Sequence, residues 1–341
     1  MRRILLIATG GTIASRYTET GLLPQISGEE LLSFVPEARE FCIIDVISPF
    51  SLDSTNIRWT QWLDLEMVIE ENYEGYDGFV VCHGTDTMAY TAAALSYLIQ
   101  NSRKPIVLTG AQRPIDLPVT DAKTNLLDSL RFASHERAHD VCIVFGGQAI
   151  AGTRAKKERT QSYNAFSSIN YPPIAVIQEK RIVFYIDDFD QKEEGPVFYH
   201  DLNPRVFLFK LIPGSDGSIL KKILPDYDAL IIESFGVGGI PAYVQDASPD
   251  NTDNSIANAL KEWRNAGKTV IMATQVTHEG SDMAVYQVGQ VIKDIYDLPE
   301  SYDMTLESTV TKVMWILSEK RDPQAFKRLF YQTINHDILF I

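Results

Sequence analysis

Two turns in this chain carry the residue types that could do chemistry. They are Thr9–Ser15 (TGGTIAS) and His83–Met88 (HGTDTM). Each follows a short apolar run, Ile4–Ala8 or Phe79–Cys82, that is typical of a buried parallel strand. In an open α/β sheet, ligands bind at the carboxyl ends of the strands. Two threonine hydroxyls and a carboxylate at that edge predict nucleophilic catalysis by threonine.

Threonine catalysis also needs a proton acceptor, because a threonine hydroxyl is a weak nucleophile. A desolvated lysine can serve, and a neighbouring aspartate can orient its ammonium form. Lys157 follows a further apolar run and so leaves the same sheet edge as Thr85 and Asp86. The alternatives are structural: Thr12 and the His83–Asp86 run could cap helices, and Lys157 could be a solvated loop charge.

The remaining motifs give weaker indications of function. The segment His135–His139 (HERAH) matches the zinc-binding pattern H-E-x-x-H. We expect it on the last turn of a helix, at the sheet edge opposite the glycine turns, so we predict that this segment binds no metal. The chain has no G-x-S-x-G elbow, and no P-loop follows Gly10-Gly11. His83 is expected to be structural and to hold its turn by hydrogen bonds.

Composition limits the partners and the compartment. The 341 residues carry a formal net charge of −14, which repels phosphate backbones and anionic membrane surfaces. We therefore expect neither a nucleic-acid nor a membrane partner. Cys42, Cys82 and Cys142 lie in apolar runs, at spacings that fit neither a metal knuckle nor a disulfide framework. Free thiols and the lack of a run of ~20 apolar residues favour a cytoplasmic protein.

The elements that must position the candidate residues follow from hydrophobic periodicity. Strands are predicted at 3–9, 41–47, 77–82, 105–110 and 140–146, a hairpin at 174–187, and further strands at 205–212, 228–233 and 269–274. Helices are predicted around Trp59–Ile69, Met88–Ile99, Leu126–Ala133, Ile256–Trp263 and 304–318.

The repeated strand–helix units predict the fold class α/β, with two domains. The larger N-terminal domain, residues 1–190, is expected to be a parallel-sheet domain of the flavodoxin or Rossmann type. Residues 191–204, which are charged and contain glycine and proline, are the predicted linker. Residues 205–341 are expected to form a smaller C-terminal α/β domain.

Taken together, these residues resemble the bacterial-type L-asparaginase family, in particular its cytosolic type I branch. Thr9–Ala14 and Gly78–Met88 resemble the two family signatures. Thr109–Pro114 (TGAQRP) and Asp303–Glu307 (DMTLE) are similar to segments that follow in the family. The resemblance covers nearly the whole chain. It implies hydrolysis of L-asparagine to L-aspartate and ammonia, without cofactor or metal.

The resemblance also implies residue roles. Thr12 would attack the side-chain amide carbon, and water would hydrolyse the acyl-enzyme. Thr85, Asp86 and Lys157 would relay protons, with Lys156 as the alternative if the motif register is one residue off. The implied substrate-binding residues are Asp53, Ser54, Thr55, Gly84, Thr85, Asp86 and Ala111. The family implies a homodimer or homotetramer with the active site near a subunit interface.

Four positions depart from the family pattern. Leu22 stands where relatives often carry a tyrosine that assists the nucleophile, and Tyr17 lies nearby. Lys156 and Glu233 replace a threonine and an arginine of a separate activating site, so activation by asparagine is not expected. Thr55 stands where some relatives have glutamine, which affects the size of the pocket.

Three other functions remain open from the sequence. A glutaminase-asparaginase of broader specificity differs by one substrate methylene, which a pocket discriminates by only ~1–3 kcal/mol. The amidohydrolase subunit of a tRNA-dependent amidotransferase shares the fold, although it should tolerate nucleic acid. A non-catalytic amino-acid sensor would need a pocket but not threonine, aspartate and lysine together.

Overall fold

Two units make up the chain in the computed structural model, which describes residues 1–19, 21–188, 195–241, 255–285, 298–319 and 322–339. The first unit comprises Met1–Asp201 and Ile334–Asp337, and the second comprises the remainder. Residues 191–194 of the predicted linker lie outside the described residues. Further along it, β14 (Val197–Phe198) pairs antiparallel with β6 (Ile99–Gln100) of the first unit.

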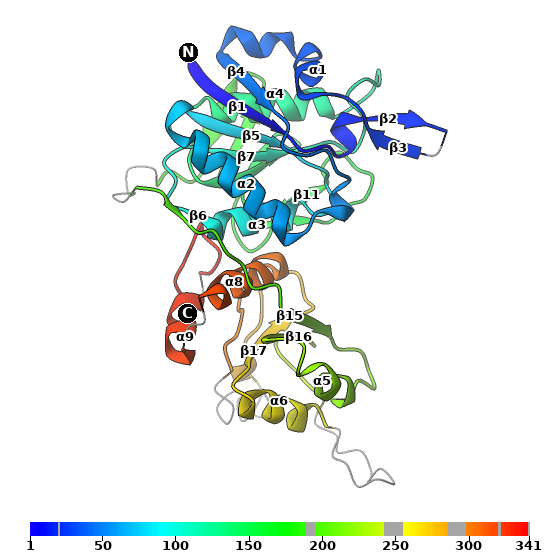
Figure 1. Cartoon of the computed structure of the whole chain (residues 1–341), viewed down its shortest axis with the longest axis vertical. Coiled ribbons are helices and arrows are strands. Elements are labelled where there is room, and N and C mark those ends of the chain that lie inside the picture. The colour runs from blue at the N-terminus through cyan, green and yellow to red at the C-terminus, as the bar shows by residue number, and fades with distance from the viewer. Residues whose placement is uncertain (20, 189–194, 242–254, 286–297, 320–321, 340–341) are drawn as a thin grey trace. The chain divides into compact units, whose positions relative to one another are not determined.

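A mostly parallel sheet is the centre of the first unit (Figure 1). Its strands, in spatial order, are β13 (Arg181–Phe184), β12 (Ala175–Gln178), β9 (Gln148–Ala151), β8 (Val141–Phe145), β7 (Ile106–Thr109), β5 (Gly78–Cys82), β1 (Arg2–Ala8) and β4 (Cys42–Ile47). The run from β8 to β4 is parallel, whereas β9, β12 and β13 are antiparallel additions. This arrangement confirms the predicted fold class, and it brings the carboxyl ends of β1, β5 and β7 to one edge.

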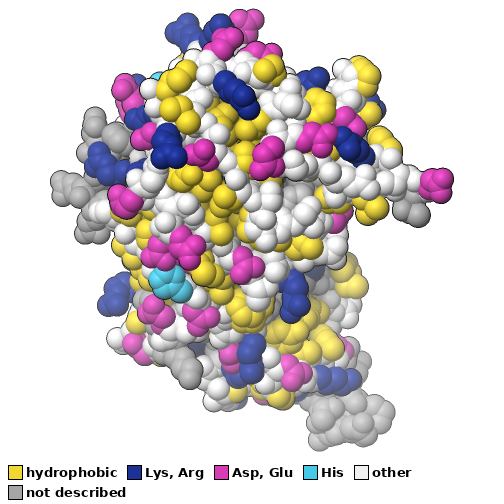
Figure 2. Space-filling model, turned by 45° about the horizontal axis from the view of Figure 1, so that its top comes forward, with side chains coloured by type: hydrophobic (Ala, Val, Ile, Leu, Met, Phe, Trp, Pro, Cys, Tyr) yellow, Lys and Arg dark blue, Asp and Glu magenta, His cyan; other side chains and the backbone are white. Residues whose placement is uncertain are grey.

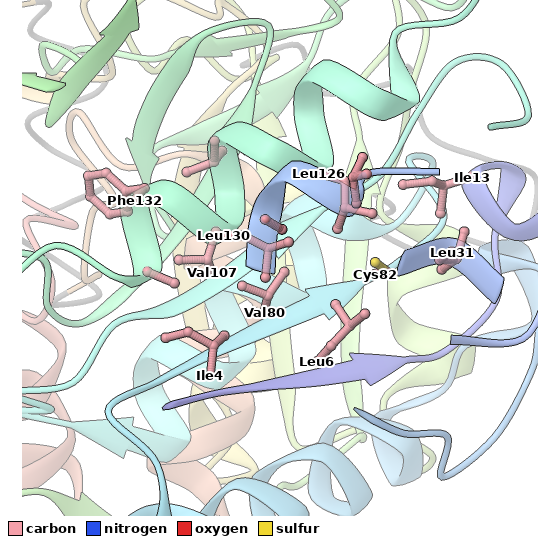
Figure 3. Packing of buried hydrophobic residues seen from close by; sticks show 14 of the residues in the cluster. Ile4, Leu6, Ile13, Leu31, Val80, Cys82, Val107, Leu126, Leu130 and Phe132 are labelled. Atoms are coloured by element: carbon pink, nitrogen blue, oxygen red, sulfur yellow. The ribbon is translucent and has the colours of Figure 1, made fainter. Parts of the chain in front are cut away.

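Helices cover both faces of this sheet, which explains why its strands are apolar without alternation. The helices are α1 (Gly28–Ser33), α2 (Trp59–Asn72), α3 (Met88–Leu98) and α4 (Ala122–Ala133). Figure 1 shows α2 and α3 on one face, and α1 and α4 on the other. Leu126 and Leu130 of α4 pack against Val80 and Val107 of the sheet in one buried cluster (Figure 3).

Short elements complete the first unit. They are η1 (Thr12–Ala14), β2 (Ser15–Thr18), β3 (Gly21–Pro24), η2 (Pro36–Glu40), η3 (Ser54–Asn56), η4 (Tyr73–Gly75), β10 (Ala155–Lys157) and β11 (Phe166–Ser168). The sequence did not predict β9, β10 or β11, because strands of three or four residues show no reliable periodicity. The late segment 334–337 joins this unit through Asn335, whose Nδ2 donates to the Val141 carbonyl at 2.8 Å.

The second unit contains a parallel sheet in the order β15 (Val206–Lys210), β16 (Ala229–Ser234) and β17 (Thr269–Thr274). Its described helices are α5 (Ser218–Ile223), α6 (Ile256–Asn265), η6 (Met283–Val285), α8 (Leu306–Ser318) and α9 (Pro323–Phe330). Trp263 of α6 is fully buried in its core, and the indole Nε1 donates to the Leu220 carbonyl at 2.9 Å. The three predicted strands and the two predicted helices are confirmed.

The HERAH segment is not helical, contrary to our expectation. Helix α4 ends at Ala133, and residues 135–139 follow it as turn and coil. The helix stops there because the chain must reverse to enter β8. Both ring nitrogens of His139 are within hydrogen-bonding distance of protein oxygens. Its Nδ1 lies 2.9 Å from the Arg137 carbonyl, and its Nε2 lies 3.0 Å from Asp188 Oδ1.

The length of the helices is relevant to membrane insertion, and the charge of the surface is relevant to nucleic-acid binding. Within the described ranges, no helix combines the length and the apolar character needed to cross a bilayer. Acidic and basic side chains are interspersed on the face shown in Figure 2. Among the described residues on that face, Lys and Arg side chains gather in no broad patch of the kind that is typical of a nucleic-acid-binding surface.

Candidate active site

Three loops meet at the carboxyl edge of the sheet, and two glycines make the approach possible. Gly11, at φ 77°, packs so closely that a Cβ there would lie 2.4 Å from the Gly84 backbone. A Cβ on Gly84 would in turn lie 2.6 Å from Ser54 Oγ. The Gly11 amide donates to the Leu52 carbonyl at 3.0 Å. The turns after β1 and β5 and the 52–55 segment are thereby fixed side by side.

Lys157 joins the two side chains that the sequence proposed as its partners. Its Nζ donates to Thr85 Oγ1 at 2.8 Å and to Asp86 Oδ1 at 2.6 Å. Thr85 is 5% exposed, the Lys157 side chain 16% and the Asp86 side chain 58%. Lys157 Nζ is thus largely withdrawn from water and held between a buried hydroxyl and an accessible carboxylate.

A two-stranded hairpin sets the direction of Lys157. On β10 it lies opposite Phe166 of β11, whose ring packs 5.1 Å from that of Phe145 at the end of β8. Successive side chains on a strand point to opposite faces. Lys156 therefore points away from Thr85, and Lys157 is the one of the two that contacts it.

The capping interpretations of both turns are wrong. Gly11 is the N-cap residue of η1, and Thr12 is the first residue inside that turn, half-buried. Helix α3 begins at Met88 with Thr87 as N-cap, and the Thr87 hydroxyl donates instead to the Ser54 carbonyl at 2.8 Å. Neither Thr85 nor Asp86 caps α3, so their side chains are available to Lys157.

The expected substrate-binding residues surround the same edge. Ser54 is buried under Gly84, whereas Asp53 and Thr55 are exposed. Asp53 Oδ1 accepts from the amide of Thr55 at 2.8 Å and from its hydroxyl at 2.7 Å, which fixes the one-turn helix η3. Ala111 is buried at the start of the loop that follows β7.

Gln112 also belongs to this site, and the sequence analysis did not select it. Its Oε1 accepts a long hydrogen bond of 3.4 Å from the Thr85 hydroxyl. Its Nε2 donates to the carbonyls of Arg159 and Ser162 at 3.3 and 3.2 Å, so the amide is anchored in the loop after β10. The strand-end rule that found the two threonine turns also applies to the loop after β7 and could have identified it.

His83 is fully buried beneath the second turn, in a continuous hydrogen-bond chain. Trp62 Nε1 donates to Thr91 Oγ1 at 3.0 Å, Thr91 Oγ1 lies 3.0 Å from His83 Nε2, and His83 Nδ1 lies 2.7 Å from the Gly84 carbonyl. A neutral imidazole protonated at Nδ1 satisfies every group in this chain. Burial lowers the pKa of His83 to about 4, in keeping with a neutral, structural role.

The buried imidazole predicts a pH-dependent stability. Below about pH 6.5 the unfolded chain protonates this histidine, whereas the folded chain resists until about pH 4, so the wild type loses stability as the pH falls through this window. Relative to His83→Gln, the loss should reach about 3 kcal/mol. Urea unfolding of both proteins at a series of pH values measures it. Burial raises the pKa values of the carboxyls Glu66 and Asp128, so their contribution to stability changes with pH in the opposite direction. Both carboxyls are present in the wild type and in the variant, so this contribution cancels in the comparison. Parallel stability profiles would contradict the prediction.

The positions that depart from the family pattern have defined places. Tyr17 and Leu22 are directly paired across the β2–β3 hairpin, so their side chains share a face. Tyr17 is 67% exposed. Lys156 lies on β10, and Glu233 on β16 accepts from Lys210 Nζ at 3.1 Å.

Comparisons with known proteins cover both units. The family model described as "Asparaginase, N-terminal" matches residues 3–189, and "Glutaminase/Asparaginase C-terminal domain" matches residues 205–330. The chain is 34% identical to an L-asparaginase of Thermococcus kodakarensis over 98% of its own length and 99% of the relative. The solved structure of the thermostable L-asparaginase from that organism aligns with a TM-score of 0.90, covering 99% of this chain and all of that one at 32% identity.

A second kind of relative is similarly close. A Glutamyl-tRNA(Gln) amidotransferase subunit of Pyrococcus furiosus is 35% identical over 96% of this chain and 74% of the relative. Sequence similarity alone therefore connects the chain to two activities.

Proposed function

The chain belongs to the asparaginase family, and from this premise we propose that it hydrolyses L-asparagine to L-aspartate and ammonia. The observation that supports this most is the contact of Lys157 Nζ with both Thr85 Oγ1 and Asp86 Oδ1. Two members of this group, Thr85 and Asp86, lie on the turn against which the Thr12 turn packs through Gly11 and Gly84.

The proposed reaction has two halves. In the first, Thr12 Oγ1 attacks the amide carbon to form a tetrahedral intermediate, and the hydroxyl proton passes to the leaving nitrogen. The C–N bond then breaks, which releases ammonia and leaves an acyl-enzyme ester on Thr12. In the second, Thr85 and the neutral amine of Lys157 take a proton from water, which attacks the ester carbon. The bond from Thr12 Oγ1 to the acyl carbon then breaks, the proton returns to Oγ1, and L-aspartate is released. Backbone N–H groups of the glycine-bearing turn are suited to stabilise the oxyanion in both halves.

Substrate recognition follows from the charges of a free amino acid. The exposed carboxylate of Asp86 can pair with the α-ammonium group, and the hydroxyls of Ser54 and Thr55 with the α-carboxylate. The backbone of Gly84 and Ala111 would line the pocket beside the side-chain amide. The proposal includes no cofactor or metal.

A coupled assay tests the proposal. Ammonia release should be measured from L-asparagine and from L-glutamine, without tRNA, across substrate concentration. We expect turnover of asparagine with the higher kcat/KM and a hyperbolic rate curve. Asparagine binding in calorimetry without turnover would instead indicate a sensor, and a sigmoidal curve would contradict our expectation about Lys156 and Glu233.

A second candidate is the amidohydrolase activity of a tRNA-dependent amidotransferase, which the likeness to the P. furiosus protein favours. The same assay separates the two functions. Ammonia release that depends on a charged tRNA or on a further protein component would support the amidotransferase, whereas release from free asparagine alone supports the asparaginase.

We also propose a cytoplasmic location and a homodimeric or homotetrameric assembly. Cys42, Cys82 and Cys142 are buried and free, which supports a reducing compartment. The assembly is an inference from family resemblance, and sedimentation equilibrium of the purified chain tests it.

A further inference from the structure

A cluster outside the threonine site brings two carboxylates and an imidazole together. Glu66 and Glu70 lie one turn apart on α2, and His200 comes from the segment after β14. One candidate ligand atom from each residue lies within 4.8 Å of the others. His200 Nδ1 is 3.3 Å from Glu66 Oε2 and 3.8 Å from Glu70 Oε2.

The buried member of the cluster has an unfilled acceptor. The Glu66 side chain is 2% exposed, yet its Oε1 has no hydrogen-bond partner among the described residues. Buried carboxylate oxygens are normally satisfied, because leaving one unpaired costs free energy. His200 Nδ1 faces the other oxygen, Oε2, so Oε1 of the same carboxylate is left for a further positively charged partner.

We propose that Glu66, Glu70 and His200 bind one divalent cation of the zinc class. Bonds of about 2.0–2.1 Å to a tetrahedral ion separate its ligand atoms by roughly 3.4 Å, close to the observed 3.3 and 3.8 Å. An imidazole with two carboxylates suits Zn²⁺ better than Mg²⁺ or Ca²⁺, which prefer oxygen ligands throughout.

The exposure of the other two ligands gives the ion an entry path and a role. The side chains of Glu70 and His200 are 42% and 63% exposed, so water can complete a fourth position. An ion bound there would tie α2 to the segment that ends the first unit at Asp201. We therefore assign it a structural role, with binding that stabilises the folded chain by mass action.

The test is equilibrium dialysis and thermal unfolding of the chelator-treated full chain with ZnSO₄ alone. We expect one Zn²⁺ per chain, a rise in Tm, and a loss of affinity of at least about tenfold in Glu66→Gln and in His200→Asn. Glu71→Gln, an exposed position on the same helix, is the matched control and should bind normally. Cobalt absorption in the visible range should report a tetrahedral site with a nitrogen ligand.

Distinct results would overturn the proposal. Absence of stoichiometric binding in the wild type would do so, as would binding lost in His135→Ala but kept in Glu66→Gln, which would assign the ion to the HERAH segment. If Glu66→Gln fails to fold by circular dichroism, the double variant Glu70→Gln/His200→Asn takes its place, and unchanged Zn²⁺ affinity there refutes the site. None of these readouts depends on amidohydrolase activity.

Discussion

Replacing Thr12 by alanine is expected to reduce kcat for ammonia release from L-asparagine by about 10⁴-fold, the scale seen when a member of a catalytic triad is removed. The hydroxyl is the proposed nucleophile, and the acyl-enzyme ester cannot form on residue 12 once it is gone. KM should change much less, because the α-groups of the substrate are held by other residues. Steady-state kinetics on the folded variant measures both constants.

Two controls make the Thr12 result specific. Thr12→Ser keeps a hydroxyl and should retain part of the activity, whereas Thr124→Ala, an exposed threonine on α4, should be normal. Rapid quenching of the wild type, followed by mass spectrometry, should place the acyl group on the peptide that contains Thr12. Near-normal turnover by Thr12→Ala, or acylation on a different peptide, would refute the assignment.

Removing the Thr85–Lys157 contact is the second large effect. Thr85→Val and Lys157→Met should each lower kcat by about 10³-fold or more, and the double variant should be little worse than either single one. The reason is geometric: the Nζ–Oγ1 distance of 2.8 Å makes the two groups one proton-transfer unit. A double-mutant cycle in kcat provides the measurement.

Lys156→Met is the matched control for Lys157→Met, because it removes the same charge from the adjacent position of β10. We expect near-normal kcat from it. Losses that multiply in the double variant would show that Thr85 and Lys157 act independently. A larger loss from Lys156→Met than from Lys157→Met would reverse the choice of register.

The difference in stability between these variants and the wild type should be small. Asp86 is largely exposed, so an ion pair to it contributes little to folding. We expect this ion pair to orient the Lys157 amine and to contribute little to the free energy of unfolding. Because the stability changes are small, a loss of kcat in these variants can be interpreted without a correction for unfolding.

The sequence by itself determined the parallel sheet and the chemical character of one edge. Apolar runs such as Ile4–Ala8 and Phe79–Cys82 are typical of strands that are buried on both faces of a sheet. Parallel strands bring their carboxyl ends to the same edge. Placing Thr12, Thr85 and Asp86 at one edge therefore needed no coordinates. The family resemblance, confirmed by the comparisons, added their expected roles.

The tertiary structure decided what depends on side-chain direction and on contacts between distant segments. The pairing of β10 with β11 directs the side chain of Lys157, and not that of Lys156, toward Thr85. The close packing of Gly11 on Gly84 places the two turns side by side. Short strands carry too little periodicity to be predicted, and Gln112 and His200 acquire partners only when loops separated by many residues meet. Local pattern fixes which face of an element is buried, whereas long-range packing fixes which atoms come within reach of each other.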